Sequence, residues 1–471
     1  MIKKSWLHHS LKLLCTSILA SSLAACHSLR GPEPTVQANI PSQFGFSKDS
    51  SINSSAQTGY QDFFSDPRLI QVIQQSLEHN RDLRTATLNI ERAKHMFQIS
   101  RNPQLPSVSL NSQALRQKTG DTTSQYYVGL GLMQYELDFW GKIRSLKDSA
   151  LDNYFATSSA RDAMQITLIA QVAEAWLMYS FAHAQLDLAE KTYNSQLASY
   201  QLNQKRFDIG IESGLSVEQS RILLETAQRD IGAYKTQVEQ AHQALNLLAG
   251  QVVSEELLAK TAIQNITSKA VIGTGLPSEL LMNRPDLRKA EFQLSAAGAN
   301  IAVARAQLYP TINLIGTAGY SSQDLSELFK HNHFEWSLGP SLDLPIFDWG
   351  TRKSNVKIAE IDQKMALSDY EKAIQSAFRE VNDALAFAAN IDERLLAQHR
   401  LADASRKSYQ LSHQLFISGI EGYLPVLDAQ RNFYEAEKER LALQQRKLNN
   451  QIELYKALGG GVVKQESSGI E

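Results

Sequence analysis

The hydrophobic pattern of residues 66–250 changes its period twice. Up to about Arg101 the apolar positions recur with helical spacing, and Asp66-Pro67 supplies an N-cap and a first-turn proline. Between about 106 and 138, apolar and polar residues alternate with a period of two, which predicts a hairpin of strands about ten residues long. After Gly141 the helical spacing returns. This part of the chain is therefore expected to contain helix, hairpin and helix in that order.

The helical stretch after the hairpin is long. Neither glycine nor proline occurs between Gly141 and Gly210, and these roughly 68 residues span about 100 Å at 1.5 Å per residue. Small and apolar residues over 163–184 follow a 3-4-3-4 spacing, which is typical of a helix-packing seam. A glycine turn at Gly210 is expected to lead into a shorter helix that returns to Gly250.

The same order of elements occurs a second time. Asp82-Leu83-Arg84 recurs as Asp286-Leu287-Arg288 at a shift of 204 residues, and Trp140-Gly141 recurs as Trp349-Gly350 at a shift of 209. Two constant offsets are hard to produce by chance. The chain is therefore interpreted as an internal duplication with about 200 residues per copy, far beyond the period of a solenoid.

Two hairpins give four strands, which are too few to close a barrel. An open sheet in lipid leaves its edges unsatisfied, whereas strands of about ten residues match a tilted bilayer span. Several copies must then share one barrel, and three copies, an assumption that periodicity cannot test, give twelve strands. The expected fold class is an α+β membrane protein. In it, a trimeric 12-stranded β-barrel continues into a long periplasmic α-helical barrel, with four strands and long helices per chain.

The amino-acid composition excludes several classes of protein. The 471 residues carry 47 basic and 49 acidic side chains, a net charge of −2, which argues against a nucleic-acid partner. Two cysteines exclude a disulfide scaffold and a cysteine-based zinc site. The mean hydropathy of −0.29 argues against a bundle of membrane-spanning helices.

The N-terminus has the features of a secretory signal. Lys3 and Lys12 lie in a basic region, and a short apolar stretch follows at 13–20. The sequence Leu23-Ala24-Ala25-Cys26 resembles the bacterial lipobox, which implies cleavage before Cys26 and lipidation of that residue. The alternative is ordinary cleavage, with Cys26 as a bystander. Lipid chains at Cys26 would anchor the chain to a membrane.

These patterns predict six segments. They are a signal peptide at 1–25, a lipid-anchored segment at 26–65, repeat 1 at 66–250 (strands about 106–138, long helices 141–250), a linker at 251–276, repeat 2 at 277–459 (strands about 310–347, long helices 350–459) and a tail at 460–471.

Four motifs connect this arrangement to a known family. They are Leu281-Met282-Asn283-Arg284-Pro285-Asp286-Leu287, Tyr309-Pro310, Phe347-Asp348-Trp349-Gly350 and Leu454-Tyr455-Lys456-Ala457-Leu458-Gly459-Gly460-Gly461. On these residues the chain resembles the TolC superfamily, and more closely its lipid-anchored NodT/OprM-like outer-membrane efflux branch. The resemblance implies a homotrimer, anchored by lipid in the outer membrane, that extends into the periplasm. It also implies a periplasmic adaptor and an inner-membrane RND transporter as partners, and passive export of drugs and other small toxic compounds.

The resemblance places a channel gate at the helix tips. Glu212 and Glu421 occupy equivalent positions of the two copies, and three copies of each would form acidic rings. The predicted gate residues are Tyr409, Ile417, Glu421, Asp208 and Glu212. The alternative is that the two glutamates are solvated turn residues and Tyr409 is a packed seam residue.

The tips are also the predicted docking surface for the adaptor. Their turns contain four glycines, for which sharp turns with positive φ give a reason. The predicted turn and docking residues are Gly210, Gly214, Gly419, Gly422, Ile211, Leu215, Ile420 and Leu424. The alternative for the four apolar residues is packing between the two helices of one tip.

The sequence gives no basis for an enzyme, a cofactor or a metal site. His331-Asn332-His333 has no third ligand nearby in the sequence and is interpreted as a solvated hairpin loop. Two other functions stay open at this point. One is a type I conduit for protein secretion, and the other is a lipid-anchored periplasmic coiled-coil scaffold that does not span the membrane.

Overall fold

The computed structural model describes residues 29–41, 43–45, 58–267 and 284–460. The predicted signal peptide, Cys26, much of the segment up to residue 65 and nearly all of the tail lie outside these residues. The chain divides into two compact units. Unit 1 comprises Met1–Gln37, Ile90–Thr157 and Lys289–Glu371, and unit 2 comprises Ala38–Asn89, Ser158–Arg288 and Lys372–Glu471. Each unit contains parts of both sequence copies, so the copies are not separate compact domains.

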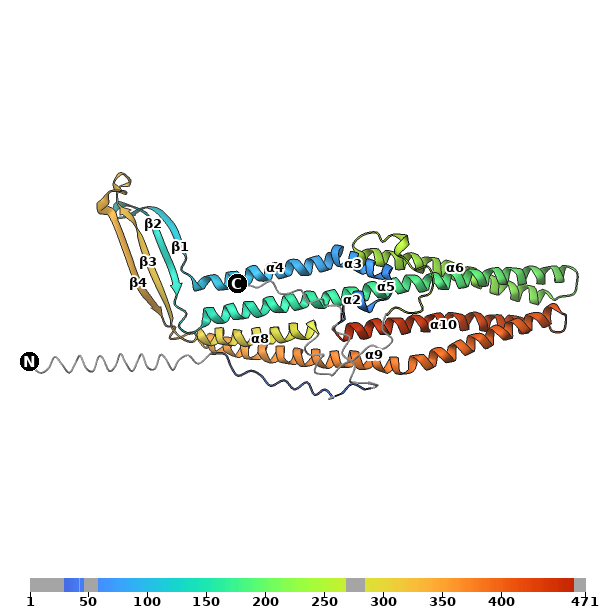
Figure 1. Ribbon diagram of the computed structural model, residues 1–471. Helices are drawn as coiled ribbons and strands as arrows, with labels where there is room; N and C mark the ends of the chain where they lie inside the picture. The colour runs from blue at the N-terminus through green and yellow to red at the C-terminus, as the bar shows by residue number, and fades with distance from the viewer. Residues whose placement is uncertain (1–28, 42, 46–57, 268–283, 461–471) are drawn as a thin grey trace, which may run out of the picture. The chain divides into compact units, whose positions relative to one another are not determined.

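Unit 1 contains one antiparallel sheet with the strand order β1-β2-β3-β4 (Figure 1). Its strands are β1 (Val108–Thr119), β2 (Asp121–Glu136), β3 (Thr311–Ser322) and β4 (Phe334–Asp343). The strands of the first hairpin, with 12 and 16 residues, are longer than the roughly ten residues expected from the sequence. Thr119 pairs directly with Asp121 around Gly120, whose φ of 105° makes the tight turn possible. The polar residues after Gly120 therefore belong to the strand.

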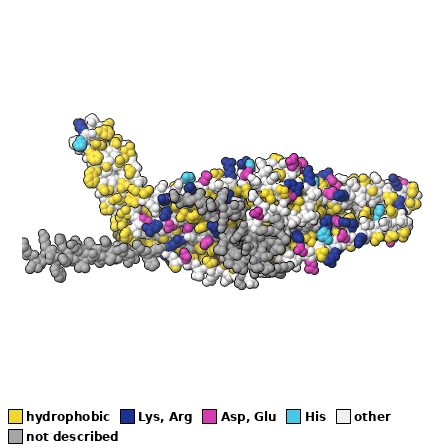
Figure 2. Space-filling view, in the orientation of Figure 1, with side chains coloured by type: hydrophobic (Ala, Val, Ile, Leu, Met, Phe, Trp, Pro, Cys, Tyr) yellow, Lys and Arg dark blue, Asp and Glu magenta, His cyan; other side chains and the backbone are white. Residues whose placement is uncertain are grey.

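The register gives the sheet two chemically different faces. The apolar face consists of Val108, Leu110, Ser112 and Ala114 of β1, Tyr126, Val128, Leu130 and Leu132 of β2, Ile312, Leu314, Gly316, Ala318 and Tyr320 of β3, and Phe334, Trp336, Leu338 and Leu342 of β4. Many of these side chains are exposed, Trp336 by 71% and Leu110 by 71%. Figure 2 shows yellow side chains over the visible side of the sheet. The polar face consists mainly of Ser, Asn, Gln, Thr and Gly.

The helices repeat between the two copies. Copy 1 contains α3 (Pro67–His79), α4 (Arg81–Arg101), α5 (Lys142–Asp208) and α6 (Gly214–Ala249), and copy 2 contains α8 (Pro285–Ala306), α9 (Thr351–Ile417) and α10 (Leu424–Ala457). The short helices are α2 (Tyr60–Phe63), η2 (Asn102–Gln104), η3 (Glu255–Leu257), η4 (Leu325–Glu327) and η5 (His331–His333). The long helices α5 and α9 have 67 residues each, as the glycine-free stretches predict. No helix among the described residues has both the length and the apolar character needed to cross a membrane.

The helices α3 and α4 each begin after a residue whose side chain caps the helix, and α3 begins at the predicted Asp66-Pro67. Asp66 accepts a hydrogen bond from the Arg68 N–H at 2.9 Å, with Pro67 in the first turn. Asn80 separates α3 from α4, and its side-chain oxygen accepts bonds from the N–H groups of Asp82 and Leu83. The helical stretch predicted up to about Arg101 is therefore two helices, separated at Asn80.

The main hydrophobic core lies in unit 2. The polar groups of two of its large aromatic side chains form hydrogen bonds to backbone carbonyls. Trp176 is fully buried, and its indole N–H donates to the Leu257 carbonyl at 2.8 Å. Tyr455 stacks on Phe63 and donates its hydroxyl proton to the Thr58 carbonyl at 2.6 Å. We call this core, which also contains Leu69, Ile73, Leu177, Phe181, Leu245 and Ile266, the equatorial core.

A buried arginine joins three segments of unit 2. The Arg284 guanidinium makes two bonds to the Asp286 carboxylate, at 3.0 and 2.7 Å. It donates further to Glu380 at 2.8 Å and to the Ala457 carbonyl at 2.9 Å. Burial raises the pKa of Asp286, but the bonds and charge of Arg284 outweigh it and hold that pKa below its usual value. Arg284 and Asp286, noticed in the sequence only as a family motif, therefore form a structural clamp.

Candidate functional site

The two helix–turn–helix tips of unit 2 have the same backbone turn. Gly210 follows α5 with a φ of 76°, and Gly419 follows α9 with a φ of 73°. In both turns the next N–H reaches back into the helix, Ile211 to the Arg206 carbonyl at 2.9 Å and Ile420 to the Leu415 carbonyl at 3.0 Å. This is the Schellman arrangement, in which a left-handed residue ends the helix. The positive φ expected at these two glycines is confirmed.

The same expectation is wrong for the other two glycines. Neither Gly214 nor Gly422 has a positive φ. Gly214 is the first residue of α6, and the turn is completed before it by Ser213, whose hydroxyl caps the helix. One left-handed residue per turn is sufficient, because it ends the helix and lets the last helical carbonyls accept hydrogen bonds from the turn.

The carboxylates of the first tip have local partners. Glu212 accepts bonds from the Ser216 hydroxyl at 2.8 Å and the Ser213 N–H at 3.1 Å, and it lies 4.0 Å from the Arg206 guanidinium. Asp208 is exposed and accepts a bond from the Gln204 amide at 2.9 Å. Glu212 therefore stabilises its own turn.

The equivalent carboxylate of the second tip is placed differently. Glu421 is exposed, and no described residue forms a hydrogen bond or ion pair with its carboxylate, although its backbone N–H lies 3.4 Å from the Leu415 carbonyl. Ile417 is 54% exposed at the end of α9. Beneath them, Phe416, Tyr423, Val426 and Leu427 form a small buried cluster against which Leu202 and Leu223 of the first tip pack. The two copies thus place equivalent glutamates in different environments.

Tyr409 connects α9 to α5. Its hydroxyl lies 3.1 Å from the Ser195 hydroxyl, which also accepts a bond from the Gln430 amide at 3.3 Å. Its ring is half-buried and stacks on Phe433, with centroids 6.2 Å apart. Tyr409 can therefore hold α5 against α9 and α10 through one weak polar contact.

A row of polar side chains, three of them buried and Arg206 half-buried, runs along α5 towards the first tip. Gln196, Ser199, Asn203 and Arg206 recur with a 3-4-3 spacing that places them on one side of the helix. We call these four residues, with Tyr423 and Gln430 of α10, the tip seam. Ten buried side-chain polar atoms of the described residues lack a hydrogen-bond partner, and six belong to the tip seam: Gln196 Oε1, Asn203 Nδ2 and Oδ1, Arg206 Nε, Tyr423 OH and Gln430 Oε1.

The tip seam was not predicted from the sequence. The sequence does contain a pattern that indicates it. On α5, polar residues recur at the 3-4-3 spacing at which a packed helix normally has apolar residues. What the sequence did not show is which helices cover that side.

The four apolar residues predicted to dock an adaptor are all exposed. Ile211 is 61%, Leu215 67%, Ile420 70% and Leu424 55% accessible. They therefore do not provide the packing within a tip, which was the alternative interpretation. Figure 2 shows yellow side chains at the end of the molecule where Figure 1 places the two turns.

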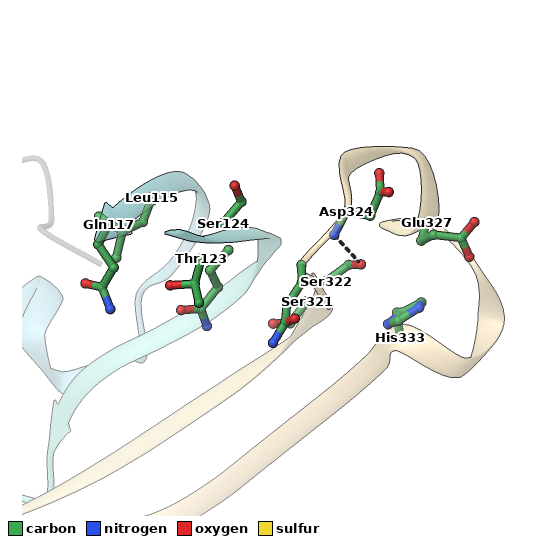
Figure 3. Close-up of a pocket in the computed structure, with 11 residues that line it drawn as sticks. Leu115, Gln117, Thr123, Ser124, Ser321, Ser322, Asp324, Glu327 and His333 are labelled. Carbon is green, nitrogen blue, oxygen red and sulfur yellow. Dashed lines mark hydrogen bonds between the residues drawn. The ribbon is translucent and has the colours of Figure 1, made fainter. Parts of the chain in front are cut away.

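A polar pocket of about 680 Å³ lies at the hairpin end of the sheet (Figure 3). It is lined mainly by the polar face, including Gln117, Thr123 and Ser321, and by Asp324, Glu327 and His333 of the β3–β4 loop. The Asp324 N–H donates to the Ser322 hydroxyl at 3.2 Å. No group of three metal-ligating side chains occurs in the described ranges.

Comparison with known proteins identifies the family. The model of the outer membrane efflux protein family matches residues 72–251 and 276–460. The chain belongs to this family. An outer membrane efflux protein of Pseudomonas putida, the antibiotic efflux pump protein ArpC, is 36% identical over 462 residues that cover 95% of each chain. The probable outer membrane lipoprotein SilC of Salmonella typhimurium is 35% identical over 463 residues, covering 96% of this chain and 99% of SilC.

A solved structure shows the same fold as this outer membrane efflux protein. The open state of the MtrE outer membrane channel of Neisseria gonorrhoeae matches with a TM-score of 0.85 and 35% identity, over 92% of this chain and 98% of MtrE. The family, the fold class and the outer-membrane location expected from the sequence are confirmed. This protein is thus the outer-membrane component of an efflux system. The segment boundaries, Cys26 and the gate residues stay predictions.

Proposed function

We propose that this protein is the passive outer-membrane conduit of a tripartite efflux pump. Antibiotics and other small toxic compounds are its substrate class, as the name of ArpC suggests. A periplasmic adaptor and an inner-membrane RND transporter are its partners, and the transporter supplies the energy. The chain itself catalyses no reaction and needs no cofactor.

The observation that carries this proposal is the four-stranded sheet. One face is apolar and exposed, as contact with lipid requires, and the other is polar, as a water-filled channel requires. Its outer strands, β1 and β4, each have one side without a partner strand among the described residues. Unpaired strand edges are costly in lipid, so pairing of β1 with β4 of another copy completes the barrel, and three copies give twelve strands.

The second tip supports a gate at the periplasmic end. Ile417 and Glu421 are exposed, and the Glu421 carboxylate has no partner among the described residues, so a trimer can turn them into an apolar ring and an acidic ring. Glu212 and Asp208, which have local partners, contribute less to this gate. The tip seam supports the same location, because a contact with unsatisfied buried groups separates more easily than an apolar one.

Single-channel recording tests the conduit and the gate together. The protein in planar bilayers should conduct ions, and the double variant Ile417→Ala/Glu421→Ala should conduct better with weaker cation selectivity. Cells that carry this variant should also take up large antibiotics faster. The matched control is Glu218→Ala/Ile222→Ala, which removes an exposed Glu and Ile four residues apart on α6. Unchanged conductance and uptake in the tip variant would contradict the gate, and the absence of any current would contradict the conduit.

The assembly has its own test. Gel mobility of the unheated and heated protein in mild detergent should show a trimer that dissociates on heating. A protein that stays monomeric under these conditions, with no current after reconstitution, would contradict the shared barrel.

A further inference from the structure

The apolar face of the sheet has charges at one end only. Arg116 and Lys118 of β1 continue the series of Val108, Leu110 and Ala114 on that face, and the register pairs them with Ser124 and Thr122 of β2. The remaining described residues that share this face are apolar, small or neutral and polar. The two exposed cations therefore lie where the apolar band ends.

Negative charges of the strands lie on the opposite face. Asp121, Glu136, Glu335 and Asp343 all share the polar face by register. No carboxylate among the described residues forms an ion pair with Arg116 or Lys118. In the neighbouring β3–β4 loop, Lys330 is already paired with Glu327. Arg116 and Lys118 are thus a site of uncompensated positive charge at the edge of a lipid-facing surface.

The strand geometry places this pair at the depth of lipid headgroups. Ten residues separate Val108 from Lys118, about 33 Å of strand at roughly 3.3 Å per residue, which a strand tilt of about 40° reduces to about 25 Å along the membrane normal. This matches the outward apolar band of about 25 Å in membrane β-barrels. The other ends of the strands join the periplasmic helices, so the hairpin end faces the outside of the cell.

We propose that Arg116 and Lys118 bind the phosphate groups of an anionic lipid in the outer leaflet. The two side chains lie two residues apart on one face, so about 7 Å of strand separates them. The guanidinium can hold a phosphate through two parallel hydrogen bonds, and the ammonium adds a point charge. The exposed apolar side chains next to them, such as Leu110, pack against the acyl chains of the same lipid.

Native mass spectrometry of the detergent-purified, full-length protein tests this site. The probe is diphosphoryl lipid A, and phosphatidylcholine, whose headgroup has no net charge, is the reference lipid. The variant Arg116→Gln/Lys118→Gln should bind lipid A roughly 30-fold more weakly, because each surface cation contributes about a fivefold factor. Binding of phosphatidylcholine should not change.

Two further variants keep the test specific. Arg92→Gln/Lys94→Gln removes an exposed Arg and Lys, also two residues apart, from α4 and should bind lipid A like the wild type. Arg116→Lys/Lys118→Arg retains both charges and should retain most of the binding. Equal lipid A binding by wild type and R116Q/K118Q would overturn the proposal, as would equal losses in the α4 control.

The inference rests on the outer-membrane location and on the apolar face, not on conduction. The binding assay measures no current, and R116Q/K118Q leaves the polar face of the sheet unchanged. A failed lipid test therefore leaves the conduit intact, and a failed conduction test leaves the lipid site intact.

Discussion

The equatorial core and the tip seam are both formed by long helices of unit 2, but they treat buried polar groups in opposite ways. In the equatorial core the Trp176 indole, the Ser180 hydroxyl and the Tyr455 hydroxyl each donate to a backbone carbonyl at 2.8, 2.6 and 2.6 Å. In the tip seam, Asn203 is fully buried, and its amide interacts with the Tyr423 hydroxyl without reaching good hydrogen-bond geometry. Long helices of the same unit therefore form one contact that is hard to separate, the equatorial core, and one that is easier to separate, the tip seam.

This difference in the hydrogen bonding of buried polar groups indicates which part of the protein can move. A buried polar group without a partner costs about 1–3 kcal/mol, whereas a satisfied one is close to neutral or favourable. Several such groups in one contact lower the free energy needed to separate the helices, while the equatorial core resists separation. A channel that opens at its tips and stays assembled at its middle needs this distribution of stability.

The largest effect is expected from the equatorial core. Trp176→Ala removes a fully buried indole and leaves the Leu257 carbonyl without its donor. The loss of transfer energy and the cavity should cost about 3–5 kcal/mol. Loss of the trimer on heating, followed by gel mobility, should occur at a clearly lower temperature. If Trp176→Ala behaved like a seam variant, the division into firm and weak regions would be wrong.

The next effect is expected from the arginine clamp. Arg284→Gln should cost about 2–3 kcal/mol, at the lower end for a buried pair, because its carboxylate partners are 42% and 44% exposed. The depressed pKa of Asp286 contributes stability above about pH 4, and this is lost as pH falls through the lower folded pKa. Acid unfolding curves should show this loss in the wild type and a smaller one in R284Q. Identical acid profiles would contradict the clamp.

A pair of matched asparagine substitutions compares a buried amide of the tip seam with a hydrogen-bonded one elsewhere in unit 2. Asn203→Leu removes two unsatisfied amide atoms from the tip seam and should stabilise the protein by about 1–3 kcal/mol. Asn450→Leu removes a buried amide that donates to the Ala384 carbonyl at 3.0 Å, and it should destabilise the protein. Thermal unfolding gives the sign of each change.

The same pair connects stability to function. Asn203→Leu should make the tips harder to open, so cells that depend on this channel should become more sensitive to exported antibiotics. The opposite signs of the two substitutions are the critical result. Equal signs would mean that the unsatisfied groups of the seam do not weaken it.

Local pattern was sufficient to predict the long elements of this fold. The absence of glycine and proline gave the lengths of α5 and α9, and the period of two gave both hairpins. The strand pairs of the first hairpin extended further than predicted, because a hairpin in a barrel continues its ladder through polar residues once it leaves the apolar band. Glycine content marked both turns, but only tertiary structure shows which glycine takes the left-handed conformation.

The candidate site was harder to predict, because it depends on which helices meet. Glu212 and Glu421 are equivalent in sequence, yet only Glu212 has a serine four residues later to accept a bond from. Position 425 holds Pro425, which has no side-chain donor. The tip seam required knowledge that α5 packs against α9 and α10, information that periodicity within one helix does not contain.

The smallest effect, and the finest comparison, comes from two tyrosine hydroxyls. Tyr423→Phe removes a buried hydroxyl whose contacts with Asn203 and Ser199 lack good hydrogen-bond geometry, and it should change stability by less than about 1 kcal/mol at neutral pH. Tyr455→Phe breaks the 2.6 Å bond to the Thr58 carbonyl and should cost about 1–1.5 kcal/mol. Burial, with a smaller effect of Tyr409, raises the pKa of Tyr423 to about 12, and the contacts of its hydroxyl with Asn203 and Ser199 oppose this shift only weakly. Because a raised pKa favours the protonated form, its contribution is complete below about pH 10 and is lost as pH rises through 12.

The wild-type tips should therefore loosen between pH 10 and 12, and Tyr423→Phe should reduce this change. Limited proteolysis at the tips across that range measures it, with Tyr455→Phe as the control that keeps the Tyr423 hydroxyl. A wild type and a Y423F variant that become sensitive to protease at the same pH would show that the tip seam is not the weak contact. If only the wild type became sensitive to protease between pH 10 and 12, the easily separated contact would lie at Tyr423 and its neighbours on α5.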